Sequence, residues 1–302
     1  MMVDVFVVLN PLAGHGNPEG VRSALLHGLA AQGVRYHVHE TGSKGQAAQW
    51  VRHAVQEGYD LFVAVGGDGT VSQVASGLLH TALPLGIVPT GAGNVLARNL
   101  GIPASRDEAL RLILSTGSTR AVDAIGVGDS IYVLAIGVGR SARIMRDTGQ
   151  LDKRHFGRLA YVATAIRALI GLQPHHFDLI IDGAPLRVRA SEIAVINLGA
   201  AGDRAIRWGE HVRPDDGRVD VCVVRIRTLI DLARAAAHLL LGRAMSAPNL
   251  RFAECRHEIR ISSRRRLPVQ ADGDFISYTP VRVRLVPGAV HIIVPSHRTG
   301  PS

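Results

Sequence analysis

The feature that most constrains this chain is a repeated alternation of apolar runs and helical segments through its first third. The runs at 3–9, 61–65 and 85–88 are continuously apolar, as strands buried on both faces are. Segments with helical periodicity lie at 21–32 and 45–58, and each is closed by a glycine. Repeated strand–helix units of this length predict a parallel sheet covered by helices on both faces. The same reasoning predicts a strand at 34–39 and helices at 71–79, from 94 through Leu100 and at 107–114.

After roughly Asp123 the pattern changes to short strands with alternating side chains. A hairpin is predicted from strands at 177–181 and 186–188 around an Asp182-Gly183 turn. We therefore expect a β-rich, antiparallel second domain. Its further strands are predicted at 219–226, 258–261, 281–286 and 290–294, the last two joined through Pro287-Gly288, with helices at 156–171 and 229–243.

Composition and charge narrow the class of partner. The 302 residues are 47% hydrophobic and 20% charged, which suits two globular domains. A formal net charge of +9 favours anionic partners, namely nucleic acid, an anionic membrane or a polyphosphate. Aromatic residues make up only 4%, which argues against a stacking platform for single strands, so no nucleic-acid partner is expected. A merely solvated basic surface and a membrane-docking role stay equally open.

The cysteines and the apolar segments bear on the compartment. Cys222 and Cys255 each lie in an apolar or strand-like run, so we expect buried, reduced thiols and a cytoplasmic protein. Residues 1–10 do not resemble a signal peptide. No uncharged apolar stretch is long enough to span a bilayer, so any membrane contact is expected to be peripheral, at the inner face.

The string Gly66-Gly67-Asp68-Gly69-Thr70 lies between a buried strand and a helix. Glycines there let backbone N–H groups approach phosphate oxygens, and the helix N-terminus attracts the same anion. A carboxylate beside polyphosphate is repulsive unless it holds Mg²⁺, so Asp68 is a candidate metal residue. The alternative is a tight glycine turn with the aspartate as a cap.

Two further glycine-rich turns follow strands, at 10–16 and 89–94. Ligands of open parallel sheets lie beyond the carboxyl ends of the strands, so the three loops are expected to converge on one site. The site predicted in this way binds a nucleotide.

Three strings carry a resemblance to a known family. They are Asn10-Pro11…Gly14…Gly16, Gly66-Gly67-Asp68-Gly69-Thr70-Val71 and Pro89-Thr90-Gly91-Ala92-Gly93-Asn94-Val95-Leu96-Ala97-Arg98-Asn99-Leu100-Gly101-Ile102-Pro103. They resemble the catalytic-domain motifs of the diacylglycerol kinase superfamily, which includes bacterial lipid kinases of about this length. Further matches extend across nearly the whole chain, at Lys153-Arg154…Gly157…Tyr161, Asp216-Gly217…Val219-Asp220-Val221 and Asp272-Gly273-Asp274.

The resemblance implies a nucleotide-binding α/β domain at 1–122, a β-sandwich-like lipid-acceptor domain at 123–289 and a site in the cleft between them. It allows the last strand, within 290–302, to return to the first domain. The implied activity is transfer of a phosphoryl group from ATP, with Mg²⁺, to a hydroxyl of a diacylglycerol-like or sphingoid-like lipid. The residues implied to touch ATP are Asn10, Pro11, Leu12, Ala13, Gly14, Thr41, Gly66, Gly67, Asp68, Gly69, Thr70, Val71, Ser72, Gly91, Ala92, Gly93 and Asn94.

Acidic residues in the second domain have implied roles as well. Asp272 or Asp274 would take the proton from the lipid hydroxyl, which needs a positioned acceptor as the phosphoryl group arrives. Without the resemblance, an ordinary Asp-Gly-Asp hairpin turn is the favoured interpretation. The resemblance also implies a metal site at Asp216 with the backbone carbonyls of Arg213 and Arg218.

The chain departs from the family pattern at several positions. Gln73 stands where the second loop usually has Glu, and Ala92 and Val95 replace a Thr and an Asp in the third loop. Asp274 stands where the last motif usually has Glu. Lost carboxylates would weaken metal organisation, which motivates a catalytically weak nucleotide-binding regulator as one alternative. An NAD kinase-like enzyme, whose family also uses Gly-Gly-Asp-Gly-Thr, is another.

The segment 229–243 carries arginines around an alanine- and leucine-rich stripe. A membrane-surface helix is one interpretation, but we favour a core-facing helix with a basic outer face. The sequence leaves the lipid acceptor and the oligomeric state open, with a homodimer as one possibility.

Overall fold

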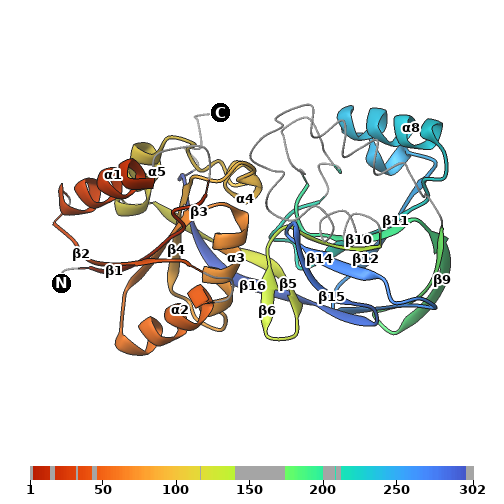
Figure 1. Cartoon of the computed structure of the whole chain (residues 1–302), viewed down its shortest axis with the longest axis horizontal. Coiled ribbons are helices and arrows are strands. Elements are labelled where there is room, and N and C mark those ends of the chain that lie inside the picture. Colours follow the sequence, from red (N-terminus) through yellow and green to blue (C-terminus); the bar gives the residue numbers. More distant parts are fainter. Residues whose placement is uncertain are drawn as a thin grey trace, which may run out of the picture. The chain divides into compact units, whose positions relative to one another are not determined.

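The computed structural model describes residues 3–13, 18–31, 33–42, 46–115, 117–139, 174–199, 208 and 212–296 (Figure 1). The chain divides into two compact units. Unit 1 comprises Met1–Ala124, Asp129–Val133 and Pro287–Ser302, and unit 2 comprises Ile125–Gly128 and Leu134–Val286. The predicted helix at 156–171 lies outside the described residues.

Unit 1 is built on a parallel sheet. Its strand order is β2-β1-β3-β4-β16, and each neighbouring pair is parallel. The five-residue apolar stretches that end β1 and β4, and all of β3, are buried, as predicted for strands covered on both faces. The bounds are β1 Asp4–Leu9, β2 Arg35–Glu40, β3 Leu61–Gly66, β4 Pro84–Pro89 and, for the part of β16 in this unit, residues 287–294 of Val281–Val294.

Helices cover both faces of this sheet, as the sequence predicts (Figure 1). Helices α1 (Pro18–Ala31) and α5 (Arg106–Leu114) pack together on one face, and α2 (Gln46–Glu57) and α3 (Asp68–Gly77) on the other. The short helix α4 (Val95–Asn99) follows β4. Strands β5 (Ser118–Val127) and β6 (Ser130–Tyr132) pair with each other, and β5 also pairs with β16.

Unit 2 is an antiparallel sandwich. One sheet has the order β12-β11-β10-β7-β14-β15, and the other runs from the first part of β16 through β13 and β8 to β9. All these pairs are antiparallel, as predicted for the second domain. The bounds are β7 Ala135–Gly139, β8 His175–Ile181, β9 Ala184–Ala190, β10 Glu192–Ile196, β11 Val219–Val224, β12 Leu250–Cys255, β13 Glu258–Ser263, β14 Pro268–Ala271 and β15 Asp274–Tyr278.

One predicted turn is present and another is not. Asp182 and Gly183 join β8 to β9 with φ of 47° and 85°, which confirms the two-residue hairpin. The turn predicted at Pro287-Gly288 is wrong, because β16 runs through it as one strand. Gly288 takes a φ of 56°, and its N–H donates to the buried Asp123 carboxylate at 2.8 Å. The dipeptide therefore makes a local irregularity inside a strand rather than a reversal.

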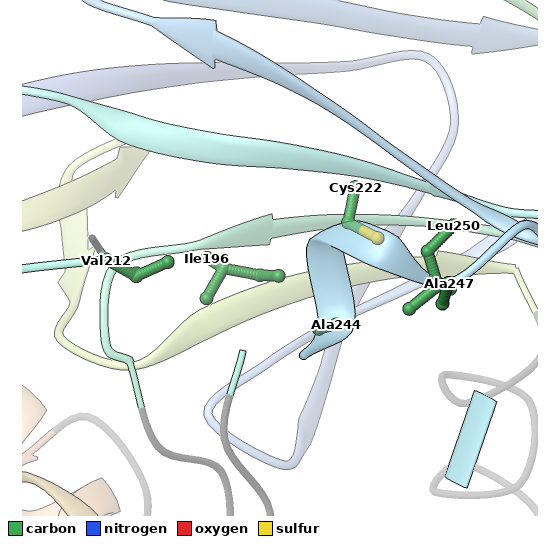
Figure 2. Close-up of a cluster of buried hydrophobic side chains, with 6 residues drawn as sticks. All are labelled: Ile196, Val212, Cys222, Ala244, Ala247 and Leu250. Carbon is green, nitrogen blue, oxygen red and sulfur yellow. The ribbon is translucent and has the colours of Figure 1, made fainter. Parts of the chain in front are cut away.

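The six-stranded sheet is covered by helix α8 (Leu229–Leu240) and the short 3-10 helix η2 (Ala244–Ser246). Figure 2 shows the buried cluster between η2 and the sheet, and Leu239 of α8 packs against this cluster. The cluster residues are Ile196, Val212, Cys222, Ala244, Ala247 and Leu250.

The two cysteines are buried free thiols, as predicted. Burial raises the pKa of the Cys255 thiol to about 12, and burial also raises the pKa of the Cys222 thiol. Helix α8 differs from the favoured interpretation. Its inner face packs on the core, as that interpretation predicts, but its outer face exposes large apolar side chains, including Ile230 and Leu240, beside the basic Arg234.

Candidate functional site

The loops predicted to bind a nucleotide leave neighbouring parallel strands at one edge of the unit 1 sheet. Hydrogen bonds continue the sheet ladder into these loops. The N–H of Asn10 donates to the Val65 carbonyl at 2.9 Å, and the N–H of Thr90 donates to the Gly66 carbonyl at 3.0 Å. On the other side of β1, the N–H of Thr41 donates to the Leu9 carbonyl at 2.8 Å. The structure thus brings the predicted loops together.

Asn10 shapes the first loop and ties it to the second. Its side-chain oxygen accepts from the N–H of Leu12 at 3.0 Å, and its carbonyl accepts from the N–H of Ala13 at 3.2 Å. Its Nδ2 donates to Thr70 Oγ1 at 3.2 Å. Thr70 is buried in the first turn of α3, so this bond fixes the loop after β1 against the start of that helix.

Two glycines let the second and third loops pass each other closely. A Cβ on Gly91 would lie 2.5 Å from the Cα of Gly67 and 2.9 Å from Asn94 Oδ1. A Cβ on Gly67 would lie 3.3 Å from the Cα of Gly91. These glycines are therefore needed for the approach of one loop to the other, in addition to any approach of a phosphate.

Asp68 joins the same two loops electrostatically. Its Oδ2 accepts from the N–H of Val95 at 3.0 Å, and its Oδ1 accepts from the N–H of Leu96 at 3.0 Å. The carboxylate thereby caps helix α4, whose first amides have no partner within the helix. The alternative interpretation expected a capping aspartate, but the capped helix begins 27 residues further along the chain. Each oxygen keeps a further lone pair with which it can accept from water or face a cation.

Asn94 closes the third loop. It has a left-handed backbone with φ of 48°, and its side chain spans the turn. Its Oδ1 accepts from the N–H of Gly91 at 3.0 Å, and its Nδ2 donates to the Gly91 carbonyl at 2.6 Å. Both polar ends of this amide therefore hold the loop in shape. Ala92, between them in sequence, is exposed.

Besides Thr70, two further predicted ligand residues have buried side chains. Val71 is buried in α3, and the hydroxyl of buried Ser72 accepts from the N–H of Val133 at 3.4 Å. Any contact from Val71 or Ser72 to a nucleotide would therefore come from the backbone. The amides of Asp68 and Gly69 open α3, where the preceding turn offers no helical carbonyl, so they can donate to an anion. Gly14 lies outside the described residues.

The structure explains the surroundings of Val95, which stands where the family pattern usually has Asp. Val95 is only 6% exposed, because its side chain packs into the apolar interior while its N–H caps onto Asp68. A carboxylate at this position would be buried beside the Asp68 carboxylate, which is costly without a cation. Val95 thus holds the third loop in two ways: its backbone N–H bonds to Asp68 of the second loop, and its apolar side chain is buried.

The predicted base residues lie in unit 2, at the hairpin between β14 and β15. Asp272 and Gly273 form its two-residue turn, with φ of 48° and 87°. The Oδ1 of Asp272 accepts from the N–H of Leu134 at 3.0 Å and of Ala135 at 3.1 Å. Asp272 therefore holds the start of β7 as well as the turn. Asp274 opens β15 and is half-buried.

The residues predicted to hold a metal in unit 2 include one buried oxygen without a partner. Asp216 Oδ2 accepts from Arg218 Nε at 2.9 Å, whereas Asp216 Oδ1 is buried and has no hydrogen-bond partner. Within the described ranges, no group of three or more His, Cys, Asp or Glu side chains could hold a metal ion. A cation at Asp216 would therefore need backbone carbonyls as further ligands, as the sequence predicts for Arg213 and Arg218.

The fold places a parallel α/β unit with linked glycine-rich loops before an antiparallel sandwich, and this order defines a class of two-domain proteins. Two family models match this chain: the diacylglycerol kinase catalytic domain over residues 4–127, and the YegS C-terminal NAD kinase beta sandwich-like domain over residues 134–294. The chain belongs to the family of diacylglycerol kinases and YegS-like lipid kinases.

Individual relatives agree over nearly the full length. A probable lipid kinase YegS-like from Stenotrophomonas maltophilia (strain K279a) is 31% identical, covering 93% of this chain and 93% of that protein. A diacylglycerol kinase from Bacillus subtilis (strain 168) is 24% identical, covering 97% of this chain and 96% of that protein. A solved structure of a diacylglycerol kinase from Bacillus anthracis str. Sterne superposes with a TM-score of 0.76 at 23% identity, over 96% of each chain, and so shares the fold.

Among the residues that the structure describes, no helix is long and apolar enough to cross a membrane. The matches at 153–161 that carried part of the resemblance lie outside these residues.

Proposed function

We propose that this protein transfers the γ-phosphoryl group of ATP to a hydroxyl of a diacylglycerol-like or sphingoid-like lipid. The observation that carries the proposal is the linkage of three strand-end loops through Asp68, Asn10 and the Gly67–Gly91 contact. Such an arrangement presents backbone amides at the carboxyl edge of a parallel sheet, which suits a polyphosphate. Membership of a lipid kinase family supports the same reaction class.

ATP binding rests on the unit 1 loops. In the proposal, the amides of Asp68 and Gly69 at the start of α3 donate to phosphate oxygens, and the positive end of that helix attracts the same anion. Loops that are already tied together by hydrogen bonds need little ordering on binding, which lowers the entropic cost. Asn10 and Asn94 serve by holding the backbone, because their side-chain amides are engaged within and between the loops.

Mg²⁺ would neutralise charge on the phosphates and orient them for in-line transfer. In unit 1 the carboxylate of Asp68 fits this role, because both oxygens keep acceptor capacity beyond their bonds to Val95 and Leu96. In unit 2 the orphaned Oδ1 of Asp216 fits a bound cation, which would satisfy a buried oxygen that otherwise costs free energy.

The proton of the lipid hydroxyl requires an acceptor, and Asp272 or Asp274 is proposed for it. The two amides of Leu134 and Ala135 fix the orientation of the Asp272 carboxylate. Asp274, on β15, is the alternative base. Loss of a general base lowers turnover by roughly 10²–10⁴-fold, which an activity assay resolves easily.

The test is a radiolabelled-ATP assay with Mg²⁺ or Mn²⁺ over a panel of diacylglycerol, monoacylglycerol, sphingosine, ceramide and NAD. We expect a labelled phospholipid, no product with Asp68→Ala, and loss of transfer but not of ATP binding with Asp272→Asn or Asp274→Asn. Asp182→Asn is the matched control. Asp182 also opens an Asp-Gly hairpin turn in unit 2 and accepts from backbone amides, so its loss perturbs a similar turn without touching the proposed base.

Each other outcome contradicts a part of the proposal. Labelled NADP in place of labelled lipid would establish the NAD kinase-like alternative. ATP binding without any product, in either metal and across all acceptors, would establish a nucleotide-binding regulator. Full transfer by both Asp272→Asn and Asp274→Asn would remove the assigned base.

A further inference from the structure

Helix α8 carries the most conspicuous unexplained surface of the described residues. Three of its large apolar side chains face solvent: Ile230 is 63% exposed, Leu240 is 60% exposed and Leu241, which caps the helix, is 69% exposed. Met245, in the following η2, is 56% exposed. Exposed apolar side chains normally occur singly, so four on one continuous segment call for a ligand or partner.

These residues form one stripe along the helix. Ile230, Ala233, Ala237 and Leu240 recur at spacings of three and four residues and are all exposed, so they lie on the same face. The opposite face is already used, because Ala235 is buried and Leu239 packs against the cluster in Figure 2. The helix is therefore apolar on both sides, and among the described residues of unit 2 only its inner side is packed against a hydrophobic cluster.

Positive charge surrounds the stripe. Arg234 lies within it, and Arg227 and Arg243 lie beyond its two ends, all three exposed. Asp231 is the single acidic residue between positions 225 and 251 of the sequence. Its carboxylate is occupied by the helix start, since it accepts from the N–H of Arg227 at 2.9 Å and of Thr228 at 3.0 Å.

We propose that the outer face of α8, together with Met245, docks on the surface of an anionic lipid bilayer. The helix would lie in the plane of the interface, with Ile230, Leu240, Leu241 and Met245 among the acyl chains and the arginines at the headgroups. Arginines at both ends suit an anionic surface, and the net charge of +9 attracts the whole chain to it.

A second copy of the chain fits this face less well. A twofold interface would place the same stripe on both sides and bring Arg227, Arg234 and Arg243 of the two copies together. Like charges that meet across an interface are repulsive, whereas an anionic bilayer neutralises them. The charge pattern therefore selects the bilayer.

Docking deepens the proposed function and rests on it in one respect: a lipid kinase must reach an acceptor that is held in a bilayer. The binding itself requires neither ATP nor acceptor. The experiment is co-sedimentation of the full chain with phosphatidylcholine vesicles, with and without about one-third phosphatidylglycerol, in the absence of ATP.

Wild-type protein is expected to bind the anionic vesicles preferentially, and more weakly at high salt. The Leu240→Ser/Leu241→Ser variant should lose at least about tenfold in partitioning, because its anchors become polar. Arg234→Gln and Arg243→Gln should each lose roughly fivefold on anionic vesicles and little on neutral ones. The matched controls, Leu186→Ser and Arg189→Gln on the exposed surface of β9, should bind like wild type.

A direct reporter follows from the same face. L241W should show a blue-shifted emission on anionic vesicles and quenching by brominated acyl chains, whereas L186W should show neither. Equal vesicle binding by wild type and by Leu240→Ser/Leu241→Ser overturns the proposal. Equal binding of the wild type to anionic and to neutral vesicles also overturns it. A wild-type dimer that this double variant converts to monomer also overturns it, since the face then joins two copies.

The two proposals can fail separately. If docking is right, Leu240→Ser/Leu241→Ser keeps turnover on acceptor lipid dispersed in detergent and loses it on vesicles. If the kinase assignment fails while docking holds, vesicle binding persists without turnover on any acceptor.

Discussion

Single residues in the unit 1 loops each perform more than one task. The sequence predicts Asp68 as a metal residue because of its charge beside a phosphate site, and in the structure its carboxylate also caps α4 through Val95 and Leu96. The family resemblance implies that Gly91 touches ATP, and in the structure its backbone also passes so close to Gly67 that a Cβ on Gly91 would lie 2.5 Å from the Gly67 Cα. Local sequence patterns predict that such residues matter. They cannot reveal the second task, because its partner lies in another loop.

The crossing of the two loops can be tested at Gly91. Gly91→Ala places a methyl group 2.5 Å from the Cα of Gly67, so the loops must separate. Overpacking of this kind costs about 1–3 kcal/mol, and here it also disturbs the predicted phosphate site. We expect a lower denaturation midpoint and weaker ATP binding, measured by urea unfolding and calorimetric titration. Ala92→Thr, at the exposed neighbouring position, should keep the wild-type denaturation midpoint. A Gly91→Ala protein with wild-type midpoint and wild-type ATP affinity would contradict the crossing.

Asp182 makes a prediction about pH. Partial burial alone would raise the pKa of its carboxyl, but the N–H groups of Arg256, Glu258 and His257 outweigh burial and lower the pKa. A lowered folded-state pKa means that Asp182 stabilises the fold above the ordinary aspartate pKa, and that this stability is lost as pH falls through the folded value. Asp182→Asn should therefore be less stable than wild type at pH 6, and the gap in unfolding midpoint should close towards about pH 2. A constant gap across this range would show that the charge is not responsible.

At the scale of elements, the apolar runs of unit 1 predicted their strands because parallel strands buried on both faces have a distinctive composition. The hairpin around Asp182-Gly183 was predictable because both turn residues favour positive φ. Strands β7 and β14 escaped prediction: β7 contains two glycines, and β14 begins with proline, so neither resembles a typical strand. Pro287-Gly288 is a typical turn sequence and so predicts a turn, but in the structure the strand continues through it, and the Gly288 N–H donates to the Asp123 carboxylate.

The start of α8 provides a prediction at this scale. Thr228 and Asp231 form a capping box, in which Thr228 Oγ1 accepts from the N–H of Asp231 at 3.1 Å and the Asp231 carboxylate accepts from the N–H of Thr228. Thr228→Ala removes one half of the box and should cost about 1 kcal/mol in free energy of unfolding. Thr228→Ser should restore it, because serine keeps the hydroxyl. Chemical denaturation monitored by circular dichroism measures both, and equal midpoints for Ala and Ser would exclude a contribution from the cap.

At the scale of the whole molecule, unit 1 depends on a strand far along the chain. His291 and Ile292 of β16 pair with Pro84 and Leu85 of β4. Strand β16 also contributes buried apolar side chains to this unit, among them Val290 and Ile293. The candidate nucleotide loops thus lie in the first third of the sequence, whereas the sheet that carries them includes residues near position 290.

Truncation tests this dependence. Deleting residues from Pro287 onwards exposes the partners of Val290, Ile292, Ile293 and Val294, whose burial is worth about 1.5–3 kcal/mol each. The total, roughly 6–12 kcal/mol, matches the entire stability of a typical domain. We expect the shortened chain to lose ATP binding and become protease-sensitive within residues 4–115, although no loop residue is removed. Deleting only residues after Ser296 keeps every described strand and should leave both properties unchanged; robust ATP binding by the shorter chain would refute the dependence.

The late position of β16 also sets an order of events during synthesis. While the ribosome is still translating the sandwich, β4 has an open edge that no nascent residue can yet occupy. The sheet of unit 1 can be completed only after residue 294 has left the exit tunnel, so its folding follows translation of the second unit instead of preceding it. A stalled chain that ends before β16 would accordingly remain a substrate for chaperones, despite containing all three candidate nucleotide loops.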